Sequence, residues 1–161
     1  MIKSFKNDTD FFNNFHKLVN KRELNSLRFN IYNKINNKIL FGKTFYEIAK
    51  NYLDELVGNE LAMQKKINLS IQMPRDKDSL LDLHSDIYAG ESPFQVVVWI
   101  PLVDVFDTKS MFFTKPKENK RMNKQLLNTD RFTTKEMYEK NKKKFNFLNI
   151  KFGNILIFCP L

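Results

Sequence analysis

The chain has 161 residues, of which 42% are hydrophobic and 28% are charged, with only 4 Gly and 5 Pro. This length suits one domain with a single core, and the composition excludes a disordered or linker-rich chain. The single cysteine, Cys159, excludes an internal disulfide and indicates a reducing compartment, for which the cytoplasm is the default.

The basic residues give the chain a formal net charge of +9. Such a charge suits a nucleic-acid partner, but 22 of the 27 basic residues are Lys, whereas base reading favours Arg. The basic runs 115–124 and 140–144 also contain few aromatic residues for base stacking. We therefore expect a solvated charged surface and no nucleic-acid partner.

The longest apolar run, 96–103, has the length of a strand. No run approaches the roughly 20 apolar residues that span a bilayer, and no apolar leader follows Met1. We therefore expect no membrane partner.

Residues 1–64 show the spacing of amphipathic helices. A first helix is predicted from Asp10 to Arg28, with His16 at the edge of its apolar face. A second helix is predicted to start at a capping box formed by Thr44 and Glu47 and to end at Gly58.

After Lys66 the apolar period changes from 3.6 to 2. The segment 67–73 alternates apolar and polar residues, which predicts a half-buried strand. Further strands are predicted in four segments: 80–88, 94–104, 109–113 and 154–161. A polar insertion, 115–144, separates the last two and is predicted to hold a short helix that starts at a Thr133/Glu136 capping box.

Helices first and strands afterwards, without βαβ alternation, predict an α+β fold with a mainly antiparallel sheet in a sandwich or barrel. We expect one domain over residues 1–161, with a helical flank at 1–64 and a β core at 65–161 that contains the insertion.

The segment 82-DLHSDIYAGESP-93 contains the residues best suited to chemistry. In a strand, His84 and Asp86 project to the same side, where one imidazole and one carboxylate can bind a single metal ion. With a second histidine they would form the facial triad of the non-haem iron(II) oxygenases. That triad leaves positions open for a 2-oxo acid and dioxygen. Fe(II) suits such a site better than Zn(II), which prefers four tetrahedral ligands.

The run 71–113 resembles the iron(II), 2-oxoglutarate-dependent oxygenases associated with carbohydrate-biosynthesis clusters, including the streptomycin-pathway oxygenase-like group. More distantly, it resembles the phytanoyl-CoA dioxygenase-like proteins. Four short matches carry the resemblance: LHSD at 83–86, GESPF at 90–94, WIPLVD at 99–104 and TKSM at 108–111. The resemblance implies a double-stranded β-helix, His84 and Asp86 as iron ligands, and 2-oxoglutarate as co-substrate.

The chain departs from this family at its C-terminal end. The family's second histidine follows a strand that 152-FGNILIFCPL-161 resembles, and the sequence stops at Leu161. His16 is a poor substitute, so only two of three ligands are accounted for. We therefore expect a C-terminally truncated β-helix.

Four further residues are candidates for the co-substrate or substrate site. Lys109, in the TKSM match, is the first choice for the distal carboxylate of 2-oxoglutarate, although a surface lysine is an equal alternative. Gln72 and Ser110 are plausible polar lining residues. Asp82 would share a face with His84 and contact substrate or support the iron ligands.

Two functions remain open. The first is an oxygenase that hydroxylates or oxidises a small molecule, with an activated or amino sugar suggested by the resemblance. The second is a catalytically silent barrel that binds a carbohydrate or a protein partner.

Overall fold

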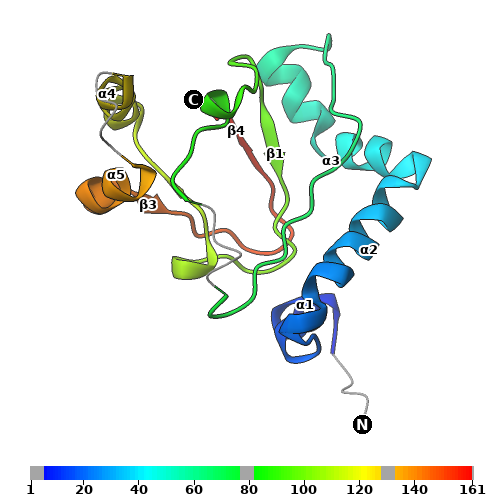
Figure 1. Ribbon diagram of the computed structural model, residues 1–161. Coiled ribbons are helices and arrows are strands. Elements are labelled where there is room, and N and C mark those ends of the chain that lie inside the picture. The colour runs from blue at the N-terminus through cyan, green and yellow to red at the C-terminus, as the bar shows by residue number, and fades with distance from the viewer. Residues whose placement is uncertain (1–5, 77–81, 128–132, 161) are drawn as a thin grey trace. The chain divides into compact units, whose positions relative to one another are not determined.

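The computed structural model describes residues 6–76, 82–127 and 133–160 (Figure 1). The chain forms two compact units, one of residues 14–80 and the other of residues 1–13 with 81–161. Within the described ranges, no helix combines the length and the apolar composition needed to cross a membrane. The single domain expected over residues 1–161 stays a prediction.

About half of the chain is helical, and the described strands are short. The α-helices are α1 (Asp8–Asn14), α2 (Leu24–Asn36), α3 (Ile39–Val57), α4 (Pro116–Leu127) and α5 (Thr134–Asn141). The 3-10 helices are η1 (Phe15–Lys17), η2 (Lys21–Glu23), η4 (Asp86–Ala89), η5 (Asp107–Lys109) and η6 (Lys142–Lys144). The strands are β1 (Val97–Trp99), β2 (Phe112–Phe113), β3 (Asn146–Phe147) and β4 (Leu156–Phe158).

The helix predicted from Asp10 to Arg28 is interrupted. Asn20 has an extended backbone, with φ −75° and ψ 135°, and its side chain accepts a hydrogen bond from the Arg22 N–H. Asparagine is a preferred N-cap because its side chain satisfies a free backbone donor at a helix start. Asn20 therefore begins a new helical stretch, η2 followed by α2.

The start predicted for the second helix is wrong, whereas its end is confirmed. α3 begins at Ile39, after an extended Lys38, so Thr44 lies inside the helix with its side chain exposed. Residues such as Leu40 and Lys43 favour a helix, so α3 begins on the N-terminal side of the capping-box pattern. Gly58 ends α3 with φ 83°, a backbone conformation that glycine adopts without steric cost.

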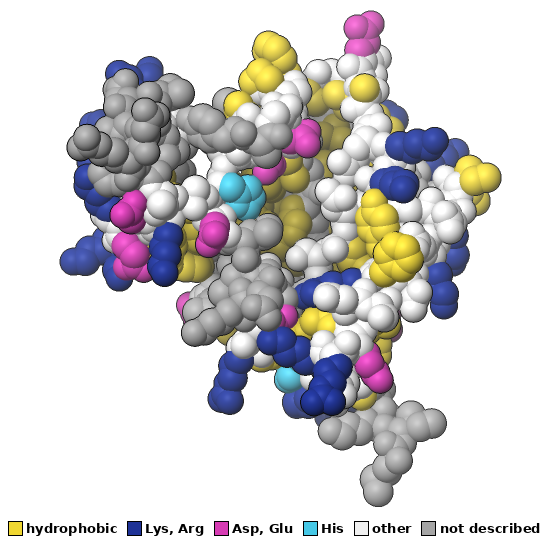
Figure 2. All heavy atoms as spheres, in the orientation of Figure 1, with side chains coloured by type: hydrophobic (Ala, Val, Ile, Leu, Met, Phe, Trp, Pro, Cys, Tyr) yellow, Lys and Arg dark blue, Asp and Glu magenta, His cyan; other side chains and the backbone are white. Residues whose placement is uncertain are grey.

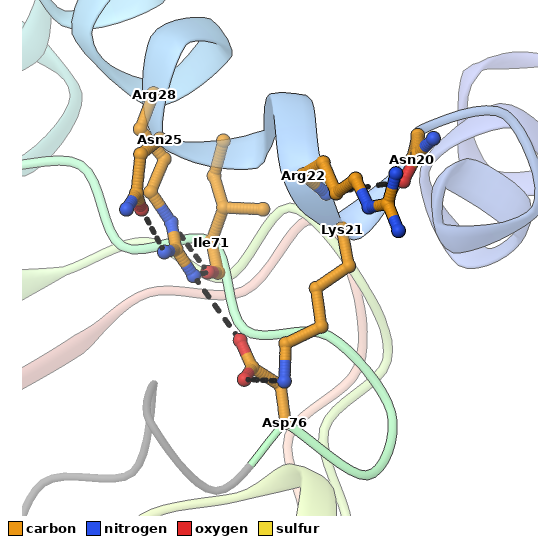
Figure 3. A network of polar contacts seen from close by, with 7 residues as sticks. All are labelled: Asn20, Lys21, Arg22, Asn25, Arg28, Ile71 and Asp76. Atoms are coloured by element: carbon orange, nitrogen blue, oxygen red, sulfur yellow. Dashed lines mark hydrogen bonds and ion pairs between the residues drawn. The ribbon is translucent and has the colours of Figure 1, made fainter.

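The alternation predicted for residues 67–73 is confirmed in the burial of their side chains, but the segment belongs to the helical unit and forms no strand ladder. Instead, side chains of α2 form hydrogen bonds with the backbone of residues 67–73. The Asn36 amide accepts from Ile67 N–H at 2.7 Å and donates to Ile67 C=O at 3.0 Å. Arg28 Nε donates to Ile71 C=O at 3.0 Å (Figure 3). These bonds satisfy backbone groups that a neighbouring strand would otherwise satisfy.

A buried carboxylate completes this polar network. Asp76 is 6% exposed, and its oxygens lie 3.0 Å from Lys21 Nζ and 3.9 Å from Arg28 Nη2 (Figure 3). Arg28 thus contacts both the backbone of residues 67–73 and the carboxylate that follows it. A buried carboxylate needs such cationic partners because its desolvation is costly.

The double-stranded β-helix expected from the family resemblance is wrong. The described strands form two antiparallel pairs, β1 with β4 and β2 with β3, and no barrel. Pro101, which lacks an N–H, follows β1 closely and limits the pairing of the predicted strand 94–104. Beyond it, one isolated bridge joins Val105 to Ile150. Residues 80, 81 and 161 of the predicted strands lie outside the described ranges.

The insertion 115–144 provides much of the core of its unit. Met122 of α4, Met137 of α5 and Phe145 form a buried cluster. Three half-buried side chains pack against it: Leu83, Phe112 and Tyr138. The predicted helix start at Thr133 and Glu136 is confirmed by a complete capping box, whereas α4 was not predicted and residues 128–132 lie outside the described ranges.

Candidate functional site

Residues 82–90 hold the His84–Asp86 pair, and they are not the strand that was predicted. The backbone is extended at Ser85 and turns into η4 at Asp86. Leu83 packs on the core cluster, and Ser85 Oγ donates to Pro160 C=O at 2.8 Å. Figure 1 accordingly shows the C-terminal end beside η4. Leu83 and Ser85 are thus fixed to the unit, while the exposed His84 between them is left on the surface.

The imidazole of His84 and the carboxylate of Asp86 face each other. His84 Nε2 lies 3.7 Å from Asp86 Oδ1. The other ring nitrogen, Nδ1, lies 2.6 Å from the backbone oxygen of Asp82. A carbonyl oxygen can only accept a hydrogen bond, so Nδ1 carries the proton. In a neutral imidazole, Nε2 then has a free lone pair, and it lies 3.7 Å from Asp86 Oδ1.

This arrangement fits a cation between the two groups. A neutral Nε2 and an ionised carboxylate are both acceptors, so they attract each other only through a proton or a metal ion. Two metal ligands at about 2.1 Å and at right angles lie roughly 3.0 Å apart, slightly less than the observed separation. The bond from Nδ1 to a carbonyl is also the support that metal-binding histidines commonly have. The two groups are therefore compatible with two ligands of one divalent metal ion.

The pair is open to solvent on one side. The side chain of His84 is 54% exposed and that of Asp86 is 33% exposed. Within residues 6–76, 82–127 and 133–160, no three His, Cys, Asp or Glu side chains gather into a group that could hold a metal ion. His16, the other histidine, is exposed on η1 in the helical unit and not at the edge of a core.

Lys109 and Ser110 contact residues other than this pair. Lys109 Nζ bonds to Asn13 Oδ1 at 3.2 Å and lies 4.9 Å from the ring centre of Phe106. Ser110 Oγ bonds to the adjacent backbone oxygen of Met111. Gln72 is exposed and belongs to the helical unit. Their roles in binding 2-oxoglutarate stay predictions.

Asp82 adjoins the pair, but its contact comes from the backbone oxygen and not from the predicted carboxylate. The bond from Ser85 to Pro160 was also not predicted. Neither contact has a recognisable sequence pattern, because each uses a backbone oxygen that any residue type could provide.

A short turn follows the pair. The Glu91 N–H donates to the Asp86 C=O at 3.1 Å, and Gly90 adopts φ 94° between them. Only glycine takes this left-handed conformation without strain, which explains the glycine after η4. The turn then leads to Phe94, whose ring is 92% exposed.

A search of protein-family models, curated proteins and solved structures found no match to this chain. The resemblance to the iron(II), 2-oxoglutarate-dependent oxygenases therefore rests on the four short matches alone and stays a prediction.

Proposed function

We propose that this chain is an iron(II), 2-oxoglutarate-dependent oxygenase in which His84 and Asp86 are two of the metal ligands. The observation that carries the proposal is the 3.7 Å approach of His84 Nε2 to Asp86 Oδ1, with the Nδ1 proton directed to Asp82 C=O. Iron(II) and 2-oxoglutarate together would supply the chemistry that oxidises an unactivated C–H bond of a small molecule.

The residues around the pair have distinct roles in this proposal. Asp82 C=O selects the tautomer of His84 whose Nε2 can bind a cation. Ser85 fixes the backbone between the two ligands by its bond to Pro160.

Metal binding tests the ligand pair directly. The chain has only 2 histidines, so histidine-selective ¹⁵N labelling gives a simple spectrum. Anaerobic titration with Fe(II) should broaden the ring signals of His84 and leave those of His16 nearly unchanged. His84→Ala should weaken Fe(II) binding at least tenfold, which is about 1.4 kcal/mol. His16→Ala is the matched control and should bind as the parent chain does.

The reaction is tested by the formation of succinate from 2-oxoglutarate in the presence of Fe(II) and dioxygen. Succinate formed by the parent chain and by His16→Ala, but not by Asp86→Ala, would support the oxygenase and would require a third ligand besides His84 and Asp86. Equal Fe(II) affinity in parent and His84→Ala would refute the ligand pair. Binding of Fe(II) without any succinate would instead favour the silent binding protein.

A further inference from the structure

The net charge of the chain is concentrated in the insertion 115–144. This stretch contains 11 basic and 4 acidic residues, which gives +7 of the total +9 within 30 residues. In Figure 2, dark-blue Lys and Arg side chains lie along the outer edge of the region of α4 and α5. The remaining residues of the chain are close to neutral, so the charge belongs to one part of the molecule.

Folding brings the two basic runs of the insertion together. Lys144 of η6 and Arg121 of α4 both bond to Glu118, at 3.1 Å and 3.0 Å. Arg121 also donates to the Asn141 side chain at 2.9 Å. The runs 115–124 and 140–144, separated in sequence, therefore lie side by side around one carboxylate.

On α4 the lysines form a row that faces away from the core. Lys117, Lys120 and Lys124 follow the i, i+3, i+7 spacing of one helix face, and all three are exposed. Met122, on the opposite face, is 4% exposed and belongs to the core cluster. We call Lys117, Lys120, Lys124 and the exposed Lys142 and Lys143 of η6 the basic surface.

The carboxylates of α4 and α5 do not neutralise the row on α4. Glu118 bonds to Arg121 and Lys144, and Glu139 bonds to Lys142. The Glu136 carboxylate accepts from the backbone N–H and the hydroxyl of Thr133 in the capping box. Among the described residues of the insertion, its three acidic side chains are thus occupied, and the excess positive charge faces solvent.

We propose that the basic surface binds the phosphate backbone of double-stranded nucleic acid without reading its sequence. Lysine provides point charges for phosphates, whereas base recognition relies on the arginine fork. Tyr138 stacks on Phe145 in the core, with ring centres 5.3 Å apart, so it is not presented to unpaired bases. A row of exposed cations along one helix therefore matches a duplex better than a single strand.

An anionic membrane is the less suitable partner. Helices that bind membranes insert large apolar side chains beside their basic residues. On the described parts of α4, α5 and η6, no large hydrophobic side chain is strongly exposed. Nucleic acid was not expected from the sequence because Lys outnumbers Arg and the basic runs contain few aromatic residues, which argues against base reading. This proposal does not depend on the oxygenase function.

Fluorescence anisotropy with a labelled random-sequence duplex of about 20 base pairs tests the proposal. The parent chain should bind, and the logarithm of its affinity should fall linearly with that of the salt concentration. Changing Lys117, Lys120 and Lys124 together to Gln should weaken binding at least tenfold. The slope of log affinity against log salt concentration should also become shallower by about 2–3, because each lost phosphate contact lowers its magnitude by roughly 0.9.

A matched control removes the same charge elsewhere. Lys34, Lys38 and Lys65 are exposed in the helical unit, and changing all three to Gln should leave both affinity and slope nearly unchanged. Equal loss in the two triple variants would mean that net charge alone drives binding and would overturn the proposal. Tighter binding to phosphatidylserine vesicles than to the duplex, lost in the α4 variant, would assign the surface to membranes. His84→Ala should bind the duplex like the parent chain, which separates this test from that of the metal site.

Discussion

At the scale of single residues, Asn36 joins α2 to the extended segment of the helical unit. Its amide bonds to both the N–H and the C=O of Ile67, the two groups that a β-ladder partner would take. Ile67 is itself only 7% exposed, so water does not easily replace the lost partner. This side chain therefore determines whether the first residue of the extended segment stays attached to α2.

Replacing Asn36 by Ala should lower the free energy of unfolding by about 1–3 kcal/mol, because a buried backbone N–H and C=O lose their partners. Urea denaturation followed by circular dichroism measures the loss, and hydrogen exchange at the Ile67 amide locates it. Asn30→Ala, on an exposed position of the same helix, is the control and should be neutral or slightly stabilising. Unchanged exchange at Ile67 in Asn36→Ala would contradict the assigned role.

At the scale of elements, the sequence predicted two helix ends that depend on neighbours along the chain. Gly58 ends α3 and Thr133 starts α5, since a helix end needs only local residues. The interruption at Asn20 is also caused by a local N-cap, but the apolar spacing continues through it, so one unbroken helix was predicted. The alternation of residues 67–73 correctly predicted which side chains are buried. In any extended backbone, successive side chains point to opposite sides, whether or not the segment pairs with another strand.

Pairing was predicted poorly because a strand's partner is set by distant residues. The apolar run around β1 indicated a buried strand, but nothing in it specifies β4 as the neighbour. The barrel was inferred from the order of helices and strands and from the resemblance, neither of which specifies strand pairing, and the structure overturned it. At the candidate site, the proximity of His84 and Asp86 follows from a two-residue spacing in an extended chain, whereas the supporting bonds use backbone oxygens and were missed.

The capping box of α5 should make its first turn sensitive to acid. Hydrogen bonds from the Thr133 backbone N–H and hydroxyl hold the pKa of Glu136 below its usual value of 4.5. Because the pKa of Glu136 is lower in the folded state, its contribution to stability is complete above the pKa of the unfolded chain. That contribution is lost as the pH falls through the pKa of the folded state. We expect the Thr133 amide signal in NMR to shift in acid with a midpoint below 4.5.

Glu136→Gln is the control for this titration, since the amide oxygen can still accept a hydrogen bond but does not ionise. In that variant the acid shift of the Thr133 amide should disappear. A midpoint at or above the usual glutamate value would show that the capping bonds do not persist in solution.

At the scale of the whole molecule, the apolar core is small for the length of the chain. Among the described residues, eight hydrophobic side chains are buried, namely Leu24, Ala49, Leu53, Ile67, Val105, Met122, Met137 and Phe145. The first four belong to the unit of residues 14–80 and the last four to the other unit. Each unit therefore depends strongly on a few side chains.

Met137→Ala should be severely destabilising for this reason. Met137 is fully buried, and removal of such a side chain costs about 2–5 kcal/mol, compared with roughly 5–15 kcal/mol for the total stability of a domain. The single tryptophan, Trp99 in β1, lies in the same unit and reports unfolding by fluorescence. Met63→Ala, at a position 44% exposed, is the control and should change stability little. Similar denaturation midpoints for the two variants would contradict the assigned core.

The contacts of Arg28 and Asn36 with residues 67–73 require that a stretch of α2 and a stretch of the extended segment have the same length. From Arg28 to Asn36 the helix rises by about 12 Å, at 1.5 Å for each residue. From Ile67 to Ile71 an extended chain covers about 13 Å, at roughly 3.3 Å for each residue. Because Asn36 bonds to Ile67 and Arg28 to Ile71, the segment runs back along the helix with matching end points. One residue inserted between Arg28 and Asn36 would displace one contact by 1.5 Å and rotate it by about 100°. The length of α2 therefore tolerates no insertion between these contacts, whereas the connection between α3 and Ile67 can vary in length without changing the register.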